Sequence, residues 1–144
     1  MTKRSEFLAG DRPDDVLFFL HEDAVDDVGA LEEYAESVAD GLILVLPGEN
    51  GRSAFQKATG IDPMALARQA METEGAIEAD LTGGRCPEEQ DEPEENHTAR
   101  FVFSFVQEET EEAGGIYAEG AVVHAYAVCH CGERYSQKWV AGER

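Results

Sequence analysis

Residues 122–140, VVHAYAVCHCGERYSQKWV, decide the fold that this sequence predicts. The β-branched and aromatic residues on both sides of Gly132 suit two half-buried strands. Gly132 and Glu133 fit a two-residue type II′ turn, in which glycine takes a positive φ at little cost. We therefore expect one long β-hairpin, in a register that places Tyr126 opposite Trp139.

Successive side chains of a strand point to opposite sides, so this hairpin should have two different faces. On one face, Cys129 and Cys131 follow the small residues Ala125 and Ala127. On the other face, the expected register gathers the aromatic and histidine side chains His124, Tyr126, His130, Tyr135 and Trp139. If exposed, they would form a patch for a partner. We expect instead that the helices cover them, as core.

The chain of 144 residues has the length of one domain, and we expect residues 1–144 to form one. It carries 31 acidic and 11 basic residues, which gives a formal net charge of −20. Such a chain repels itself in dilute buffer, whereas molar salt shortens the Debye length to about 3 Å. The composition therefore favours a halophilic protein. An acidic mesophilic protein and a mimic of a basic partner are the alternatives.

The sequence also limits location and partners. The apolar run from Leu42 to Leu46, which no other exceeds, is far shorter than the ~20 residues of a membrane span, and we expect no apolar leader. We expect a soluble, cytoplasmic protein without a membrane partner. Nucleic acid is not an expected partner, because the chain has no basic stripe to meet phosphates.

The first half of the chain is richer in helices. We expect strands at Val16–Leu20 and Gly41–Leu46, and helices at Ala30–Ala39, Arg52–Thr59 and from Asp62 to about Gly75. In the last helix, Met64, Ala67, Ala70 and Met71 are expected to form one side. Residues 77–84 are expected to be irregular.

An acidic segment at about 88–97 has no apolar residue, and we expect a mobile loop there. The second half then begins with an alternating strand at Ala99–Val106. The predicted class is α+β: an antiparallel sheet that ends in the C-terminal hairpin, with the helices of the N-terminal half packed on one face.

Six segments together resemble an uncharacterised haloarchaeal family, a domain of unknown function. They are Glu6–Gly10, Gly51–Phe55, Leu81–Gly84 with Cys86–Pro87, Phe101–Phe105, Tyr117–Gly120, and Cys129–Gly132 with its hairpin. The resemblance spans nearly the whole chain and implies a haloarchaeal source. It implies no activity.

A zinc site is the first candidate for chemistry. Cys129 and Cys131 on one face of the hairpin supply two thiols, and Cys86 supplies a third. A tetrahedral zinc needs a fourth donor, for which we name His130, with His97 and His124 as alternatives. On a regular strand, His124 and His130 point away from the cysteines. In a reducing compartment a disulfide framework is not expected, so the thiols are metal ligands, buried core residues or redox groups.

An anion site is the second candidate. It would use the turn between a strand and a helix, where free N–H groups attract negative charge: Gly48, Asn50, Gly51, Arg52 and Ser53. The segment is not a P-loop, because Leu46 and Arg52 stand where the motif has Gly and Lys. The alternative is an ordinary turn in which Asn50 caps the helix.

The leading hypothesis is therefore a non-enzymatic binding or regulatory module that acts through contact with a protein partner, with a structural zinc as one option for its cysteines. The second hypothesis is a small ligand-binding or enzymatic domain that uses the Gly51-Arg52-Ser53 turn. No catalytic motif is present to favour an enzyme.

Overall fold

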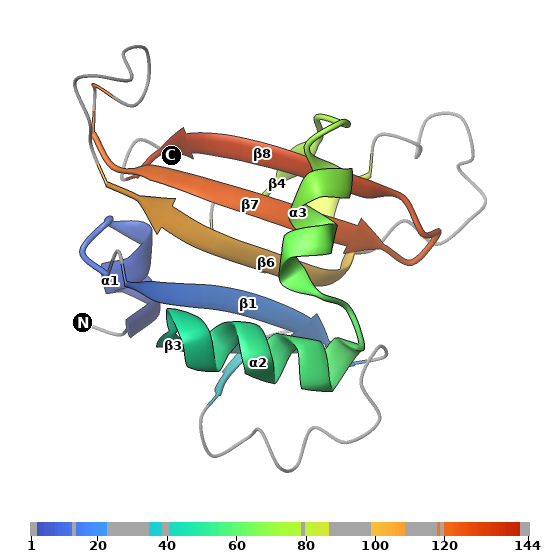
Figure 1. Cartoon of the computed structure of the whole chain (residues 1–144), viewed down its shortest axis with the longest axis horizontal. Helices are drawn as coiled ribbons and strands as arrows, with labels where there is room; N and C mark the ends of the chain where they lie inside the picture. The colour runs from blue at the N-terminus through green and yellow to red at the C-terminus, as the bar shows by residue number, and fades with distance from the viewer. Residues whose placement is uncertain are drawn as a thin grey trace.

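The computed structural model of the chain describes residues 3–12, 14–22, 35–38, 41–78, 80–86, 99–108, 118 and 120–141 (Figure 1). The helices in these residues are α1 (Lys3–Leu8), α2 (Gly48–Thr59) and α3 (Pro63–Ala70). The strands are β1 (Asp15–His21), β2 (Glu36–Val38), β3 (Gly41–Pro47), β4 (Ala76–Ile77), β5 (Gly84–Arg85), β6 (Ala99–Gln107), β7 (Val122–Cys129) and β8 (Arg134–Val140).

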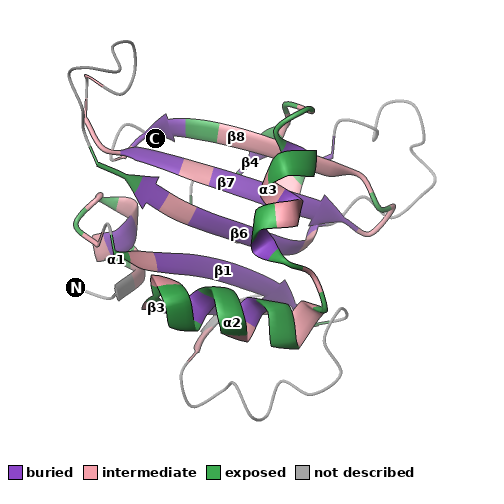
Figure 2. Cartoon of the chain, viewed as in Figure 1, coloured by how far each residue is buried: buried purple, intermediate pink, exposed green. Residues whose placement is uncertain are grey.

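Six strands form one antiparallel sheet in the order β2-β3-β1-β6-β7-β8. β1 lies between β3 and β6, and it is buried from Val16 to His21 (Figure 2). The strands expected at 16–20, 41–46 and 99–106 are β1, β3 and β6. The predicted class is confirmed: the fold is α+β, and the C-terminal hairpin β7–β8 closes one edge of the sheet.

One face of the sheet is covered by α2 and α3, and we call it the helix face (Figure 1). Its centre is aromatic: the ring of Phe55 lies 5.5 Å from that of Phe18 and 5.1 Å from that of Phe103. The C-terminal end of α2 and the N-terminal end of α3 follow the sequence as expected, whereas α3 ends at Ala70 and not near Gly75. Gly60, with φ of 75°, ends α2, and the Asp62 side chain accepts a hydrogen bond from an N–H of the first turn of α3.

The opposite face, which we call the thiol face, has small side chains along β7. Ala125, Ala127 and Cys129 of β7 are fully buried there. Phe7 of α1 packs into the same apolar cluster, and so does Ile77 of β4. Small side chains on β7 leave room for other backbone segments to approach the sheet closely.

The register of the hairpin differs from the expected one. Val128 lies opposite Arg134, and Val123 lies opposite Trp139, so the strands are displaced by an odd number of residues. An odd displacement moves every side chain of a strand to the other face. Tyr135 and Trp139 consequently pack on the thiol face with the cysteines, not with Tyr126 on the helix face. All three aromatic residues are buried, as expected, but helices α2 and α3 cover only Tyr126, and His124 and His130 are half-buried.

Other local expectations were wrong. Residues 36–38 form the edge strand β2, not a helix, because their backbone pairs with β3; the rest of the helix expected at 30–39, apart from Ala35, lies outside the described residues. In α3, Leu66 and Ala70 are buried while Met64 and Met71 are exposed. Residues 77–84 are not wholly irregular, since β4 pairs with β5.

Two further expectations concern the acidic loop and a membrane-spanning segment. The loop expected at 88–97 lies outside the described residues. None of the helices in the described part of the chain has the length and apolarity that a membrane span requires.

Candidate metal centre

Residues 71–78 and 80–86 pass from the helix face to the thiol face around the edge strand β8, and we call them the edge-crossing segment. At the edge, the N–H of Ser136 donates to the carbonyl of Thr73 at 2.9 Å, and the N–H of Gly75 donates to the carbonyl of Ser136 at 3.0 Å. Figure 1 shows α3 before this crossing and β4 after it, on opposite sides of the sheet. The segment ends at Cys86, directly after β5.

The other two cysteines lie at the end of β7 and in the turn that follows it: Cys129 is the last residue of β7, and Cys131 is in the turn. The N–H of Gly132 donates to the carbonyl of Cys129 at 2.9 Å, and the N–H of Cys129 donates to the carbonyl of Glu133 at 2.9 Å. Gly132 has φ of 97°. These features are those of a tight turn followed by a glycine bulge, which is longer than the expected two-residue turn. The bulge accounts for the displaced register, and it keeps Cys131 packed against the thiol-face core.

The three thiols meet at this end of the sheet. Sγ of Cys86 lies 3.7 Å from Sγ of Cys131, and all three sulfur atoms lie within 4.8 Å of one another. Cys86 and Cys129 are buried, and Cys131 is half-buried. We call these three residues the thiol group. Its assembly from two distant segments is what the sequence predicted.

The histidines named as a fourth ligand are not part of the thiol group. The ring of His130 packs edge-to-face against that of His21, with centroids 5.1 Å apart. His124 stacks on Phe105 on the helix face, as strand alternation predicted. His97 lies outside the described residues. The described structure thus supplies three donors, and His130 as the fourth stays a prediction.

Burial controls the protonation of the thiol group. Removal from water, followed by the neighbouring thiols of Cys131 and Cys86, raises the pKa of Cys129 to about 12. Cys129 is therefore a neutral thiol near pH 7, which disfavours it as a nucleophile. Three thiolates at this spacing would repel one another strongly unless a cation neutralised them.

Tyr135 adjoins the thiol group and was missed by the sequence argument. Its side chain is fully buried, and its hydroxyl has no hydrogen-bond partner among the described residues. A Cβ atom at Gly84 would stand 2.7 Å from this hydroxyl oxygen, so β5 runs directly against the ring. Burial, and then the charges of the three cysteines, raise the pKa of Tyr135 above its ordinary value. The only signal in the sequence for the position of Tyr135 was the hairpin register. The odd displacement of that register moved Tyr135 from the expected helix face to the thiol face.

The expected anion site has a different local structure. Helix α2 begins at Gly48, not at Arg52, and the residue before it, Pro47, makes no side-chain cap. The N–H of Gly48 donates to the carbonyl of Asp14 at 2.9 Å. Gly51 is buried inside the helix, where a Cβ atom would overlap Val16. These two glycines pack α2 against the sheet, and the anion site with Asn50, Arg52 and Ser53 stays a prediction.

The fold and the site together define an α+β protein with a candidate metal centre made of three cysteines. Residues 35–142 match the model of a family of unknown function (DUF5807), and the chain belongs to that family. Comparison with curated proteins and with solved structures found no significant match.

Proposed function

We propose that the protein is a non-enzymatic binding module in which the thiolates of Cys86, Cys129 and Cys131 hold one zinc ion. The observation that carries the proposal is the thiol group: every cysteine of the chain lies in it. Thiolates are soft donors, which favour Zn²⁺ over hard cations such as Mg²⁺ and Ca²⁺. Zinc also has no redox chemistry of its own, which suits a structural role.

The sulfur spacing supports a metal over a disulfide. With Zn–S bonds of about 2.3 Å, two corners of a tetrahedron lie about 3.8 Å apart. The Cys86 and Cys131 sulfur atoms are 3.7 Å apart, whereas a disulfide would hold them at about 2.0 Å. Two thiols can also rest at 3.7 Å in simple contact, so the decisive measurement is metal content.

A zinc ion here would connect the edge-crossing segment to the β7–β8 turn. Cys86 is the last residue of that segment, Cys129 is the last residue of β7, and Cys131 lies in the turn. An unfolded chain does not hold these residues together, so the free energy of metal binding adds to the stability of the fold. The ion would act as a structural link, without a role in a reaction.

His130 is the proposed fourth donor. Structural zinc sites are almost always four-coordinate, and His130 lies between two members of the thiol group in sequence. Its imidazole packs against His21, so coordination requires the side chain to turn away from that contact. If His130 does not bind, water completes the tetrahedron, and the two arrangements differ in affinity.

Elemental analysis of protein purified in high salt tests the zinc proposal. We expect one equivalent of zinc, lost in Cys131→Ser and retained in the control His124→Ala. His130→Ala should lower zinc affinity if the imidazole is a ligand, and should leave it unchanged if water takes that place. Circular dichroism checks that each variant folds. Wild-type protein that contains no zinc, and takes up none after reconstitution, would refute the proposal.

We further propose that the protein works in the cytoplasm of a salt-adapted cell, by contact with another protein. The net charge of −20 supports the first part. For the second part, Met64 and Met71, at the two ends of α3, are exposed at 61% and 67%. Flexible methionine side chains adapt well to a partner surface.

Thermal unfolding at two salt concentrations tests the salt adaptation. We expect the melting temperature to rise between about 0.2 M and 2 M KCl, because added ions screen the repulsion between carboxylates. The rise should shrink at about pH 4, where many of the carboxylates are neutral. A melting temperature that is unchanged or lower in 2 M KCl would contradict the proposal.

A further inference from the structure

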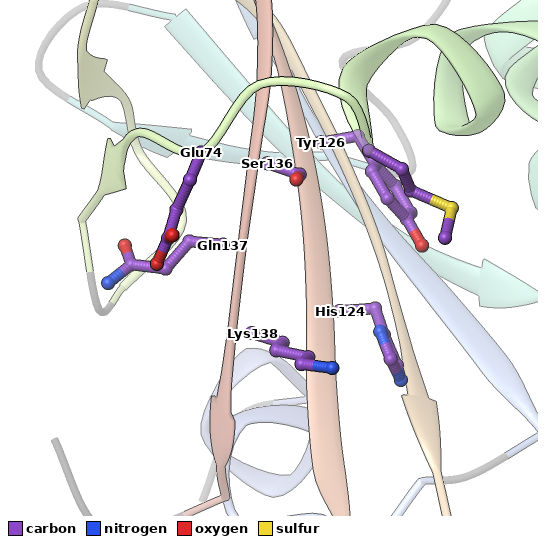
Figure 3. Close-up of a pocket in the computed structure, with 7 residues that line it drawn as sticks. Glu74, His124, Tyr126, Ser136, Gln137 and Lys138 are labelled. Atoms are coloured by element: carbon purple, nitrogen blue, oxygen red, sulfur yellow. The ribbon is translucent and has the colours of Figure 1, made fainter. Parts of the chain in front are cut away.

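The helix face is not covered evenly. Helix α3 lies over the middle of β7 and β8, where Tyr126 is buried. Farther along the same strands, His124 is half-buried and Lys138 is exposed. A pocket of about 430 Å³ opens between these residues and the C-terminal end of α3, where Met71 lines it (Figure 3). That volume suits a small molecule.

Polar groups from two neighbouring strands converge on this pocket. His124 of β7 lies opposite Lys138 of β8 in the strand register. Figure 3 shows these two side chains extending side by side, with Tyr126 and Ser136 farther along the same strands. The pocket is thus lined by an ammonium group and a phenol, while the Ser136 hydroxyl donates to the carbonyl of Thr73 at 3.4 Å.

His124 is held in place as a rigid wall of the pocket. Its ring stacks on Phe105 with centroids 4.9 Å apart, and its Nε2 lies 3.0 Å from Oε1 of Gln107. Burial, and then the charge of Lys138, lower the pKa of His124 below its ordinary value. The imidazole is therefore mainly neutral near pH 7, and Lys138 is the cation of the pocket.

The charge at this site contrasts with the rest of the chain. The sequence has a net charge of −20 and lysine only at Lys3, Lys57 and Lys138. The acid that lines the pocket, Glu74, lies beside Gln137 across β8 from the Lys138 ammonium group (Figure 3). An ammonium group set among donors and aromatic rings, in a chain this acidic, is suited to recognise an anion.

We propose that this pocket binds a small aromatic carboxylate, with the carboxylate on Lys138 and the ring against Tyr126 and Met71. A carboxylate carries one negative charge, which one lysine can balance. A phosphate dianion would bring two charges to a single cation in a strongly acidic protein. The pocket lies on the helix face and the thiol group on the other, so this proposal does not depend on zinc.

Titration of the full-length protein with sodium benzoate, followed through backbone amide NMR signals, tests the proposal. We expect saturable shifts at Tyr126, Ser136 and Lys138, with a dissociation constant of roughly 1 mM. Lys138→Met should weaken binding at least about tenfold, because it removes a charge-assisted hydrogen bond. Lys57→Met removes an equal charge from an exposed site on α2 and should leave binding unchanged.

Benzamide, which has the same shape without the charge, provides a second control. We expect it to bind at least about tenfold more weakly than benzoate. Equal binding of the two compounds, equal losses in Lys138→Met and Lys57→Met, or no saturable shift with benzoate would each overturn the proposal. Inorganic phosphate that moves these amides while benzoate does not would overturn the assignment to a carboxylate.

Discussion

The two faces of the sheet are closed by different means. On the helix face, α2 and α3 bring large side chains onto the strands, and Phe55 fills the space between Phe18 and Phe103. On the thiol face, β7 presents alanine and cysteine, and short segments cover it. Both faces bury large apolar side chains. The thiol face is covered by short segments instead of two longer helices, so a bond that links those segments has more effect there.

The largest expected effect concerns the helix face. Phe55→Ala should lower the free energy of unfolding by about 3–5 kcal/mol, because it leaves a cavity among fully buried rings. Urea unfolding should give the same loss with and without a zinc chelator, since contacts on separate faces contribute independently. A loss that disappears on chelation would show that the faces are coupled. The control Met64→Ala, at an exposed site of the same face, should change stability by less than about 0.5 kcal/mol.

The next effect concerns the contact between the edge-crossing segment and the sheet. A Cβ at Gly84 would stand 2.7 Å from both the Tyr135 hydroxyl and the Ala76 carbonyl. We expect Gly84→Ala to cost about 1–3 kcal/mol, because a close-packed site must open to admit the methyl group. Zinc affinity should fall as well, because the same strand positions Cys86. Zinc competition and urea unfolding measure the two effects, with Glu72→Ala as an exposed control in the same segment. Unchanged zinc affinity would show that β5 does not position Cys86 for metal binding.

The two faces also differ in how far the sequence predicted them. The strands at 16–20, 41–46 and 99–106 follow from apolar runs and alternation, and the ends of α2 and α3 follow from Gly60 and Asp62. Each of these signals depends on residues that are close together in the sequence, so it can be recognised without knowledge of the tertiary structure. The helical period of α3 was ambiguous, because both methionine and leucine are among its apolar residues. Only packing into the apolar cluster of the helix face decides that Leu66 is buried.

The sequence predicted which residues belong to the thiol group, but it did not predict how the chain brings them together. Its three members follow from the cysteine positions, whereas the route of Cys86 depends on β4 and β5, which are too short to show a period. The turn at Gly132 is compatible with two loop lengths, and they differ by an odd displacement of the strands. That one choice decided whether Tyr135 faced the helices or the thiols.

Tyr135→Phe sharpens the comparison because its two effects should have opposite signs. Without metal, the variant should be as stable as the wild type or more stable by about 1 kcal/mol, since it removes a buried hydroxyl that has no described partner. With metal, zinc affinity should fall roughly tenfold, because thiolates around zinc would accept a hydrogen bond from that hydroxyl. Urea unfolding in chelator and competition with Co²⁺ measure the two quantities. An apo variant much less stable than the wild type would show that the hydroxyl already has a partner.

The smallest expected effect concerns His124, which lines the pocket on the helix face. The pKa of His124 is lowered in the folded protein by burial and by Lys138, whereas in the unfolded chain it is near 6.5. As pH falls below the unfolded value, the unfolded state takes up a proton that the folded state resists, so stability decreases until the folded pKa is passed. His124→Gln removes this dependence and retains an amide that can hydrogen-bond Gln107.

Many carboxylates also titrate on the acidic side of this range, so the comparison with His124→Gln isolates the histidine. The free energy of unfolding measured at about pH 7.5 and about pH 5.5 should fall more in the wild type than in His124→Gln. The groups that face the imidazole are Lys138 from β8 and, from β6, Phe105 and Gln107. Lys138→Met should therefore reduce the difference in part, because it removes the nearby charge and leaves the burial. Identical pH dependence in wild type and His124→Gln would show that water reaches His124 and solvates its imidazolium.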